Sequence, residues 1–235
     1  MANPPFNVSD WGGASLQDSN LWEFGVPPVG NANYAWLQHF AKKLNPTGTA
    51  GIVLANGSMT TTAGTENEIR HKMIQQGLVD CMVAVPTQLF FNTPIPACLW
   101  FLARNRKNHK FRDRSKEILF IDARKMGTMI SRKHRALTED DIAKISETYH
   151  NWRNKNGNYA DVAGFCKSAA IKEVEESNFV LTPGRYVGAE DIEDDGIPFE
   201  EKVAEITSQL SEQFAKSIEL QQRIKENLAK IGIEL

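Results

Sequence analysis

Residues 66–86 read ENEIRHKMIQQGLVDCMVAVP, and this stretch decides the fold class. Residues 66–77 predict a helix that ends at Gly77. Residues 79–86 form a short apolar run, which is typical of a buried strand in a parallel sheet. The same reasoning predicts one more helix and three more strands, at 33–44 (NYAWLQHFAKKL), 51–57 (GIVLANG), 97–104 (ACLWFLAR) and 116–123 (KEILFIDA). Strands that alternate with helices indicate an α/β layer with a mostly parallel sheet.

The tetrapeptide Asn3-Pro4-Pro5-Phe6 suits the methylation of an exocyclic amino nitrogen. The N6 amine of adenine is a poor nucleophile, so an enzyme must accept both its hydrogens and aim its lone pair at a methyl donor. The amide oxygen of Asn3 is one acceptor, and the carbonyl of Pro4, held extended by Pro5, is the second. Phe6 offers a stacking surface, worth roughly 1–3 kcal/mol per base, to a base flipped out of a duplex. The alternative is a proline-rich turn at a frayed N-terminus.

Six blocks of the chain resemble, in order, the C-terminal half of the modification (M) subunit of type I restriction-modification systems. The blocks are MANPPFNVSDW, GIVLANGSMT, IRHKMIQQGLVDCMVAVPTQLFFNTPIPACLWFLARN, KEILFIDARKMG, LTEDDIAKISETYHNWR and GFCKSAAIKEVEESNFVLTPGRYVG. The resemblance implies an adenine-N6 DNA methyltransferase that uses S-adenosylmethionine. It also implies a partial Rossmann-like class I methyltransferase fold, comprising the C-terminal part of the sheet and a C-terminal helical tail.

The resemblance assigns roles to six residues. Asn3, Pro4, Pro5 and Phe6 correspond to the loop that holds the adenine amine. Phe90 corresponds to the aromatic that stacks on the other side of the flipped base, with Phe91 as the neighbouring candidate. The alternative for Phe90 is burial in the core.

The family's glycine-rich donor turn, which resembles Asp-Pro-Ala-Cys-Gly-Ser-Gly, has no counterpart here. Such a turn must open a helix directly after a strand, and we predict that the nearest glycines (Gly48, Gly51, Gly57, Gly157 and Gly164) do not. The cofactor-binding residues therefore stay unassigned, and we expect this chain, a truncated frame or designed fragment, to be inactive alone. Only Met1 and Ala2 remain of the family's catalytic strand, so we expect self-association through the sheet edge beside residues 51–57 or through the tail.

Three domains are predicted, at 1–135 (partial catalytic domain), 136–199 (helical or irregular extension with an acidic linker) and 200–235 (coiled-coil-like helix). The apolar stripe of the tail repeats every 3.5 residues on average, which is the coiled-coil period. Its positions are Val203, Ile206, Leu210, Phe214, Ile218, Gln221, Ile224, Leu228 and Ile231. The alternative is an amphipathic helix that folds back on its own domain. The resemblance favours pairing with the helices of the specificity (S) subunit, and it names DNA and the restriction (R) subunit as further partners.

The net charge of −2 conceals two biased segments. Residues 100–135 carry twelve Lys and Arg against three acids, and this stretch either contacts DNA phosphates or forms a solvated loop around the strand at 116–123. Residues 173–201 carry ten acids against one Arg, and AEDIEDDG is predicted to be a flexible linker.

Cys81, Cys98 and Cys166 have no metal or redox spacing, and the histidines are scattered. We therefore expect no metal site, reduced thiols and a cytoplasmic protein without a membrane span. Two alternatives to the methyltransferase remain. One is a non-catalytic assembly module that binds the S subunit. The other is an amino-methyltransferase that acts on RNA or on a protein glutamine, which the order of the six blocks argues against.

Overall fold

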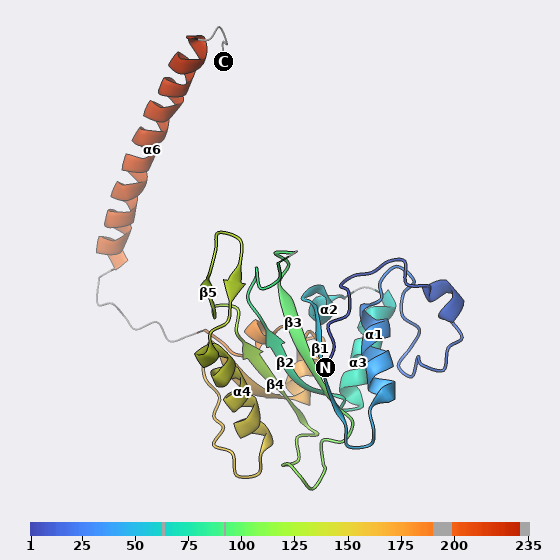
Figure 1. The fold of residues 1–235 in the computed structure, drawn as a ribbon. Coiled ribbons are helices and arrows are strands. Elements are labelled where there is room, and N and C mark those ends of the chain that lie inside the picture. The colour runs from blue at the N-terminus through green and yellow to red at the C-terminus, as the bar shows by residue number, and fades with distance from the viewer. Residues whose placement is uncertain (63, 92, 190–198, 231–235) are drawn as a thin grey trace. The chain divides into compact units, whose positions relative to one another are not determined.

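The computed structural model describes residues 1–62, 64–91, 93–189 and 199–230. The chain divides into two compact units, Met1–Asp191 and Ile192–Leu235, and each is described by itself. Within the first unit a sheet carries helices on both faces (Figure 1). The division into three domains stays a prediction. The predicted acidic linker falls largely on residues 190–198, outside the described residues.

The sheet has five strands in the order β1-β3-β2-β4-β7. They are β1 (Thr49–Ala55), β2 (Val79–Ala84), β3 (Ala97–Ala103), β4 (Glu117–Asp122) and β7 (Cys166–Ala170). The prediction of a mostly parallel sheet is wrong, because only β2 and β4 form a parallel pair and the other three pairs are antiparallel. The physical reason is the segment from 85 to 96. Its described residues form no crossover helix, so the chain returns as β3 antiparallel to β2. The strand β7 was not predicted, since CKSAA carries little apolar signal.

Two helices cover the first face of the sheet. These are α1 (Asn33–Lys43) and α3 (Gly64–Gln75), as predicted to within two residues. Tyr34 and Met73 from these helices join a buried apolar cluster with Met82 and Trp100 of the sheet. Short elements complete the first unit, namely η1 (Gly13–Leu16), α2 (Gly57–Thr60), β5 (Thr128–Met129), β6 (Arg135–Ala136), α5 (Ile171–Glu176) and η2 (Pro183–Arg185).

The second face of the sheet is covered by α4 (Glu139–Arg153), which begins with a capping box between Thr138 and Asp141. Trp152 of this helix packs with Cys81, Val83 and other alternating strand residues, as expected for side chains that point to opposite faces. Beside this cover the face is open. Two apolar hollows, of about 350 and 360 Å³, both reach Leu99 and Phe101.

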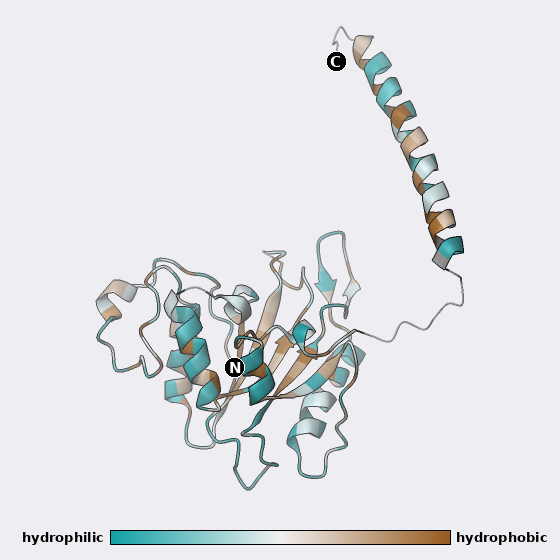
Figure 2. Cartoon of the chain, turned by 180° about the vertical axis from the view of Figure 1, so that it is seen from behind, coloured by the Kyte–Doolittle hydropathy of each residue, from teal (hydrophilic) through white to brown (hydrophobic). Residues whose placement is uncertain are grey.

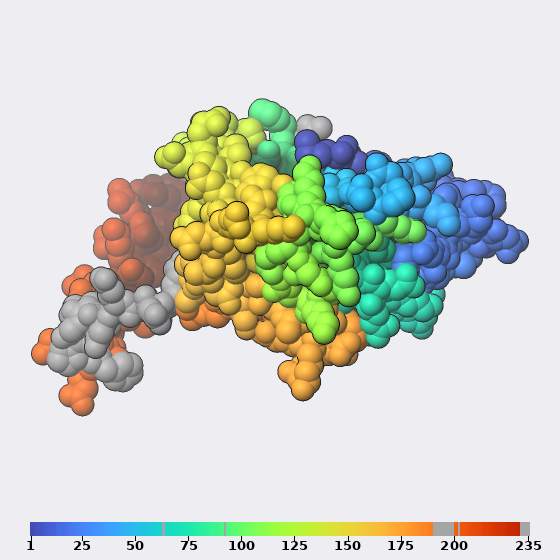
Figure 3. All heavy atoms as spheres, turned by 90° about the horizontal axis from the view of Figure 1, so that it is seen from below, coloured from blue at the N-terminus to red at the C-terminus, as the bar shows by residue number. Residues whose placement is uncertain are grey.

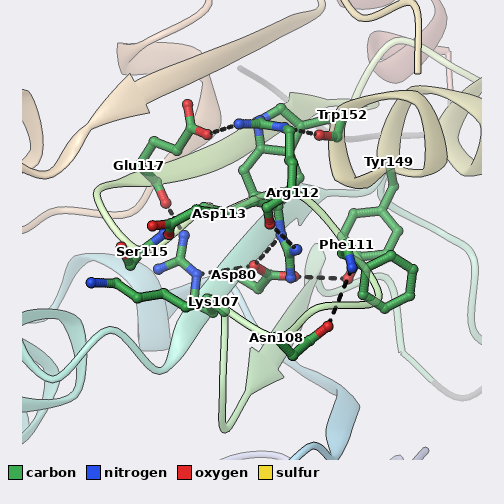
Figure 4. A network of polar contacts seen from close by, with 12 residues as sticks. Asp80, Lys107, Asn108, Phe111, Arg112, Asp113, Ser115, Glu117, Tyr149 and Trp152 are labelled. Atoms are coloured by element: carbon green, nitrogen blue, oxygen red, sulfur yellow. Dashed lines mark hydrogen bonds and ion pairs between the residues drawn. The ribbon is translucent and has the colours of Figure 1, made fainter. Parts of the chain in front are cut away.

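The basic loop from 104 to 116 is tied to the sheet by a buried ion cluster (Figure 4). The carboxylate of Asp80 accepts hydrogen bonds from Arg106 Nε at 3.0 Å and from Arg114 Nε at 3.1 Å. Both arginine side chains are almost fully buried. Neither the phosphate-contact nor the solvated-loop prediction therefore holds for these two residues. The rest of the loop lies at the surface beside α4 (bright green in Figure 3).

The second unit contains α6 (Phe199–Ala229), close to the helix predicted from residue 200. Hydrophobic residues recur along its length (brown in Figure 2). They are exposed, and Phe214 and Ile218 are 62% and 68% accessible. Ile231 lies outside the described residues. No helix in the described part of the chain is long and apolar enough to cross a membrane.

Candidate active site

The predicted site residues lie at one end of the strands, where β1, β2 and β4 end and β3 begins. Ala55 at the end of β1 faces Ala97 at the start of β3, and Ala84 at the end of β2 faces both Cys98 and Asp122. The segments that follow β1, β2 and β4 therefore leave the sheet at this end of the strands (Figure 1). The loop from 104 to 116 follows β3 and leaves the sheet at the opposite end of the strands.

Hydrogen bonds hold the Asn3–Phe6 segment at both ends. Before it, Ala2 N donates to Gly51 O at 2.9 Å and Val53 N donates to Ala2 O at 3.0 Å, which adds one parallel bridge to the outer side of β1. After it, Asn7 N donates to Asn33 Oδ1 at 3.1 Å, and Asn33 Nδ2 donates to Asn7 Oδ1 at 2.8 Å. Asn33 is the first residue of α1 and is only 2% exposed. The segment thus spans a fixed distance between the sheet edge and the start of a helix.

Six predicted residues line one hollow of about 530 Å³, a size typical of small-molecule sites. The lining consists of Asn3, Pro4, Pro5, Phe6, Phe90, Phe91 and Thr93. The rings of Phe6 and Phe90 meet edge to face, with centroids 5.7 Å apart and planes at 85°. Among the described residues, no ionisable side chain lines this hollow.

Phe90 and Phe91 have different environments although they are adjacent. Phe90 is half-buried and packs against the apolar cluster under α4, so it both lines the hollow and belongs to the edge of the core. Phe91 is 88% exposed, and its ring lies 4.1 Å from the ring of His134. One side of the Phe90 ring therefore packs on the core, as in the alternative interpretation, and the other side lines the hollow.

Asn7, Asn33 and His134 contact the site and were not predicted. Asn7 follows the tetrapeptide directly and has a left-handed φ of 53°, which asparagine tolerates better than most residues. A local signal for Asn7 was therefore present. Asn33 and His134 lie 26 and 43 residues away from their partners in the chain, and no local pattern links them.

The described residues do not fit the methyl donor. Gly57 does open a helix after a strand, so that part of the sequence prediction is wrong. However, α2 has only four residues, and Gly48 lies in the turn that starts at Asn45. Gly51 lies within β1 and faces Phe101. No glycine-rich cradle for the donor forms in the part of the chain that the structure describes.

The three cysteines are buried and unpaired. Burial raises the pKa of the Cys98 thiol to about 12 and also raises the pKa of Cys81 and Cys166. The thiols therefore behave as small core side chains, as the sequence predicted for Cys81 and Cys98.

Comparison with known proteins identifies the family. Residues 1–195 match the family described as N-6 DNA Methylase. The type I restriction enzyme HindI methylase subunit of Haemophilus influenzae is 53% identical, over 100% of this chain and 51% of the relative. The MjaIX methylase subunit of Methanocaldococcus jannaschii is 38% identical, over 99% of this chain and 42% of the relative. The chain thus spans about half the length of these curated relatives.

Solved structures agree with this assignment. The type I restriction-modification methyltransferase subunit of Streptococcus thermophilus superposes with a TM-score of 0.67 at 27% identity, over 79% of this chain and 37% of that one. The M protein of type I restriction enzyme EcoKI shares the fold, with a TM-score of 0.57 at 15% identity, over 94% of this chain and 49% of that one. The predicted partial class I methyltransferase fold is confirmed. The chain belongs to the N-6 DNA methylase family, and within it to the methylase subunits of type I restriction-modification systems.

Proposed function

We propose that this chain forms the adenine-binding side of a DNA adenine-N6 methyltransferase. The observation that carries the proposal is that Asn3–Phe6 line one hollow together with Phe90, Phe91 and Thr93. Asn3 Oδ1 and the carbonyl of Pro4 accept the two N–H groups of the target amine. The rings of Phe6 and Phe90, which meet edge to face in this structure, separate in this proposal to stack on the two faces of the flipped base. Phe91, at the rim, is the second stacking candidate.

The backbone of the tetrapeptide supports this role. Neither proline has an N–H, and among the described residues the carbonyl of Pro4 accepts no hydrogen bond. This carbonyl is therefore available to a ligand. Two acceptors on this tethered segment draw the amine toward a tetrahedral geometry and expose its lone pair. The proton is released to water after methyl transfer, so the absence of an ionisable lining residue is compatible with the reaction.

S-adenosylmethionine supplies the methyl group to the parent enzyme in this proposal. The described residues account only for the acceptor side, because they form no glycine-rich cradle. We therefore propose that the 235-residue chain alone transfers no methyl group. Calorimetry that detects micromolar binding of S-adenosylmethionine to this chain would contradict that statement.

The proposed partners are DNA, the S subunit and the R subunit. The exposed apolar stripe of α6 supports helix pairing with the S subunit, and target sequence recognition then lies in S. Removal of residues 199–235 is expected to abolish capture of the S subunit, and full retention of capture would reject the role of α6. The buried, unpaired cysteines suit a reducing compartment, so we place the protein in the cytoplasm.

The decisive test is methyl transfer by a methylase subunit that contains this chain, assembled with its S subunit. Asn3→Ala is expected to lower the rate at least about a hundredfold, as for loss of one fixed donor or acceptor in a preorganised site. Asn105→Ala is the matched control, because Asn105 lies in the loop at the opposite end of the strands. A rate within twofold of the unmodified enzyme for Asn3→Ala would refute the proposal.

A non-catalytic assembly module is the second candidate. The exposed stripe of α6 and the apolar hollows at Leu99 and Phe101 favour it, since both offer surfaces for other chains. Self-association belongs to this candidate, through α6 or through the edge of β1, where only Ala2 pairs among the described residues. A strictly monomeric species in light scattering at micromolar concentration would count against self-association. Methyl transfer that depends on Asn3 would reject a purely structural role.

A further inference from the structure

A short hairpin stands beside the hollow. Residues 126–136 form β5, a turn and β6. This segment leaves the sheet at the same end of the strands as the Phe90–Phe91 segment (Figure 1). We infer that this hairpin is a DNA-contacting finger. In this inference Arg132 and Lys133 bind phosphates next to the flipped nucleotide, and Met129 and Ile130 contact its apolar sugar face. The inference rests on the proposed function and adds to it the path of the DNA strand.

The hairpin touches the wall of the hollow directly. Arg135 N donates to Gln88 O at 2.8 Å, and His134 Nε2 lies 3.2 Å from Leu89 O. The ring of His134 lies against Phe91, which lines the hollow. Arg132 and Lys133 precede His134 in the chain, so their charges are held within a few residues of the entrance for the base.

The base of the hairpin is braced. Arg135 Nη1 donates to the carbonyls of Met126 and Gly127, at 3.1 and 2.9 Å. Gly127 N donates to Asp141 Oδ2 at 3.1 Å, which ties the hairpin to the capping box of α4. Gly127 has a φ of +81°, and an added Cβ would come within 2.8 Å of Ala136 O. Arg135 therefore has a structural role, and the turn is carried on a fixed base.

The turn itself presents free positive charge. Arg132 and Lys133 are exposed, and in the described parts of the chain neither side chain forms a hydrogen bond or an ion pair. Arg124 differs, because its guanidinium is paired with Asp122 at 2.5 Å. Residues 126–136 contain no acid. Met129 and Ile130 are 45% and 61% exposed beside these charges. Cations next to apolar side chains suit a nucleic-acid strand, which offers phosphates and apolar sugar surface together.

The chain contains a matched control for this surface. Lys107 and Lys110 are also exposed and basic, but they lie in the loop at the opposite end of the strands. A DNA strand that places a base in the hollow passes the hairpin and not this loop. The inference therefore separates two segments of similar composition by position alone.

The experiment measures binding of the full 235-residue chain to a short fluorescein-labelled duplex by anisotropy, between about 50 and 200 mM salt. Arg132→Ala/Lys133→Ala is expected to weaken binding about tenfold at the lowest salt and to reduce the slope of log K against log salt by about 1 to 2. Lys107→Ala/Lys110→Ala is expected to change affinity less than about twofold. Ile130→Ala is expected to weaken binding without changing the slope. Circular dichroism establishes that each variant is folded.

Equal losses for the two double variants would overturn the inference, as would a chain without salt-dependent affinity for DNA. Either result leaves the proposed function standing, because the Asn3→Ala rate tests that separately. The Asn3→Ala test measures a methylation rate, whereas the hairpin test measures an affinity and its salt dependence. A failure of the methylation test would therefore not imitate a failure of the hairpin test.

Discussion

The buried carboxylate of Asp80 gives the sharpest stability prediction, and the perturbation is Asp80→Asn. Four hydrogen bonds converge on this carboxylate (Figure 4). Arg106 Nε donates at 3.0 Å, Arg114 donates through Nε at 3.1 Å and Nη2 at 3.3 Å, and the hydroxyl of Tyr149 donates at 2.8 Å. Asparagine keeps the shape but removes the charge and turns an N–H₂ group toward these donors.

The expected loss is about 3–5 kcal/mol in the free energy of unfolding, because a buried charge pair is broken by removal of one partner. The side chains of Arg106 and Arg114 are only 2% and 1% exposed, so water does not replace the carboxylate. Burial lowers the pKa of Arg106, and Asp80 is the main opposing influence. Since a domain is stable by roughly 5–15 kcal/mol, this loss amounts to between about a fifth and all of the folding stability.

Urea unfolding followed by tryptophan fluorescence measures this loss, since Trp100 and Trp152 are fully buried. Tyr149→Phe removes one of the four hydrogen bonds and should cost about 1.5 kcal/mol. Glu173→Gln breaks an ion pair with Lys167 in which the side chains are 37% and 33% exposed, and it should cost at most about 1 kcal/mol. An Asp80→Asn variant no less stable than Glu173→Gln would refute the reasoning that burial sets the magnitude.

Three further outcomes are expected. Asn33→Ala removes both hydrogen bonds to Asn7 and should lower the free energy of unfolding by about 1–3 kcal/mol in urea titrations; an unchanged value would mean that this pair does not hold the loop. The thiols of Cys81, Cys98 and Cys166 should resist a thiol reagent until denaturant is added, because they are buried, and one fast-reacting thiol in the native protein would contradict this. Burial lowers the pKa of His71, with Arg70 adding to the effect. The unfolded chain therefore binds the proton first, and stability should fall as pH drops below about 6.5. His71→Gln should weaken that pH dependence in urea midpoints, and an identical profile would reject it.

The regular elements were largely predictable because their signals are local. The apolar runs at β1, β2, β3 and β4 and the spacing in α1 and α3 placed these elements to within about two residues. Strand pairing was not predictable in the same way. It depends on whether the connection from β2 to β3 crosses the sheet, and the described residues of that connection form no helix. The strand β7 pairs with β4 across more than forty residues and has little apolar signal of its own.

The candidate site divides along the same line. Asn3–Phe6 was readable from its chemistry, and Phe90 from the resemblance to the family. Their meeting in one hollow, and the contacts of Asn33 and His134 with it, depend on segments far apart in the chain.

The sequence by itself predicted the class of fold from apolar periodicity, the candidate residues for an adenine amine from side-chain chemistry, and the family from the resemblance of six ordered blocks. It also located the positive charge between residues 100 and 135. Only the tertiary structure decided what that charge does. Arg106 and Arg114 neutralise a buried carboxylate near one end of the strands. Arg132 and Lys133 lie at the other end, beside the hollow, with no side-chain partner among the residues that the structure describes. The physical reason is that the strand directions place loops of similar composition at opposite ends of the strands, and the local sequence of a loop does not specify at which end it lies.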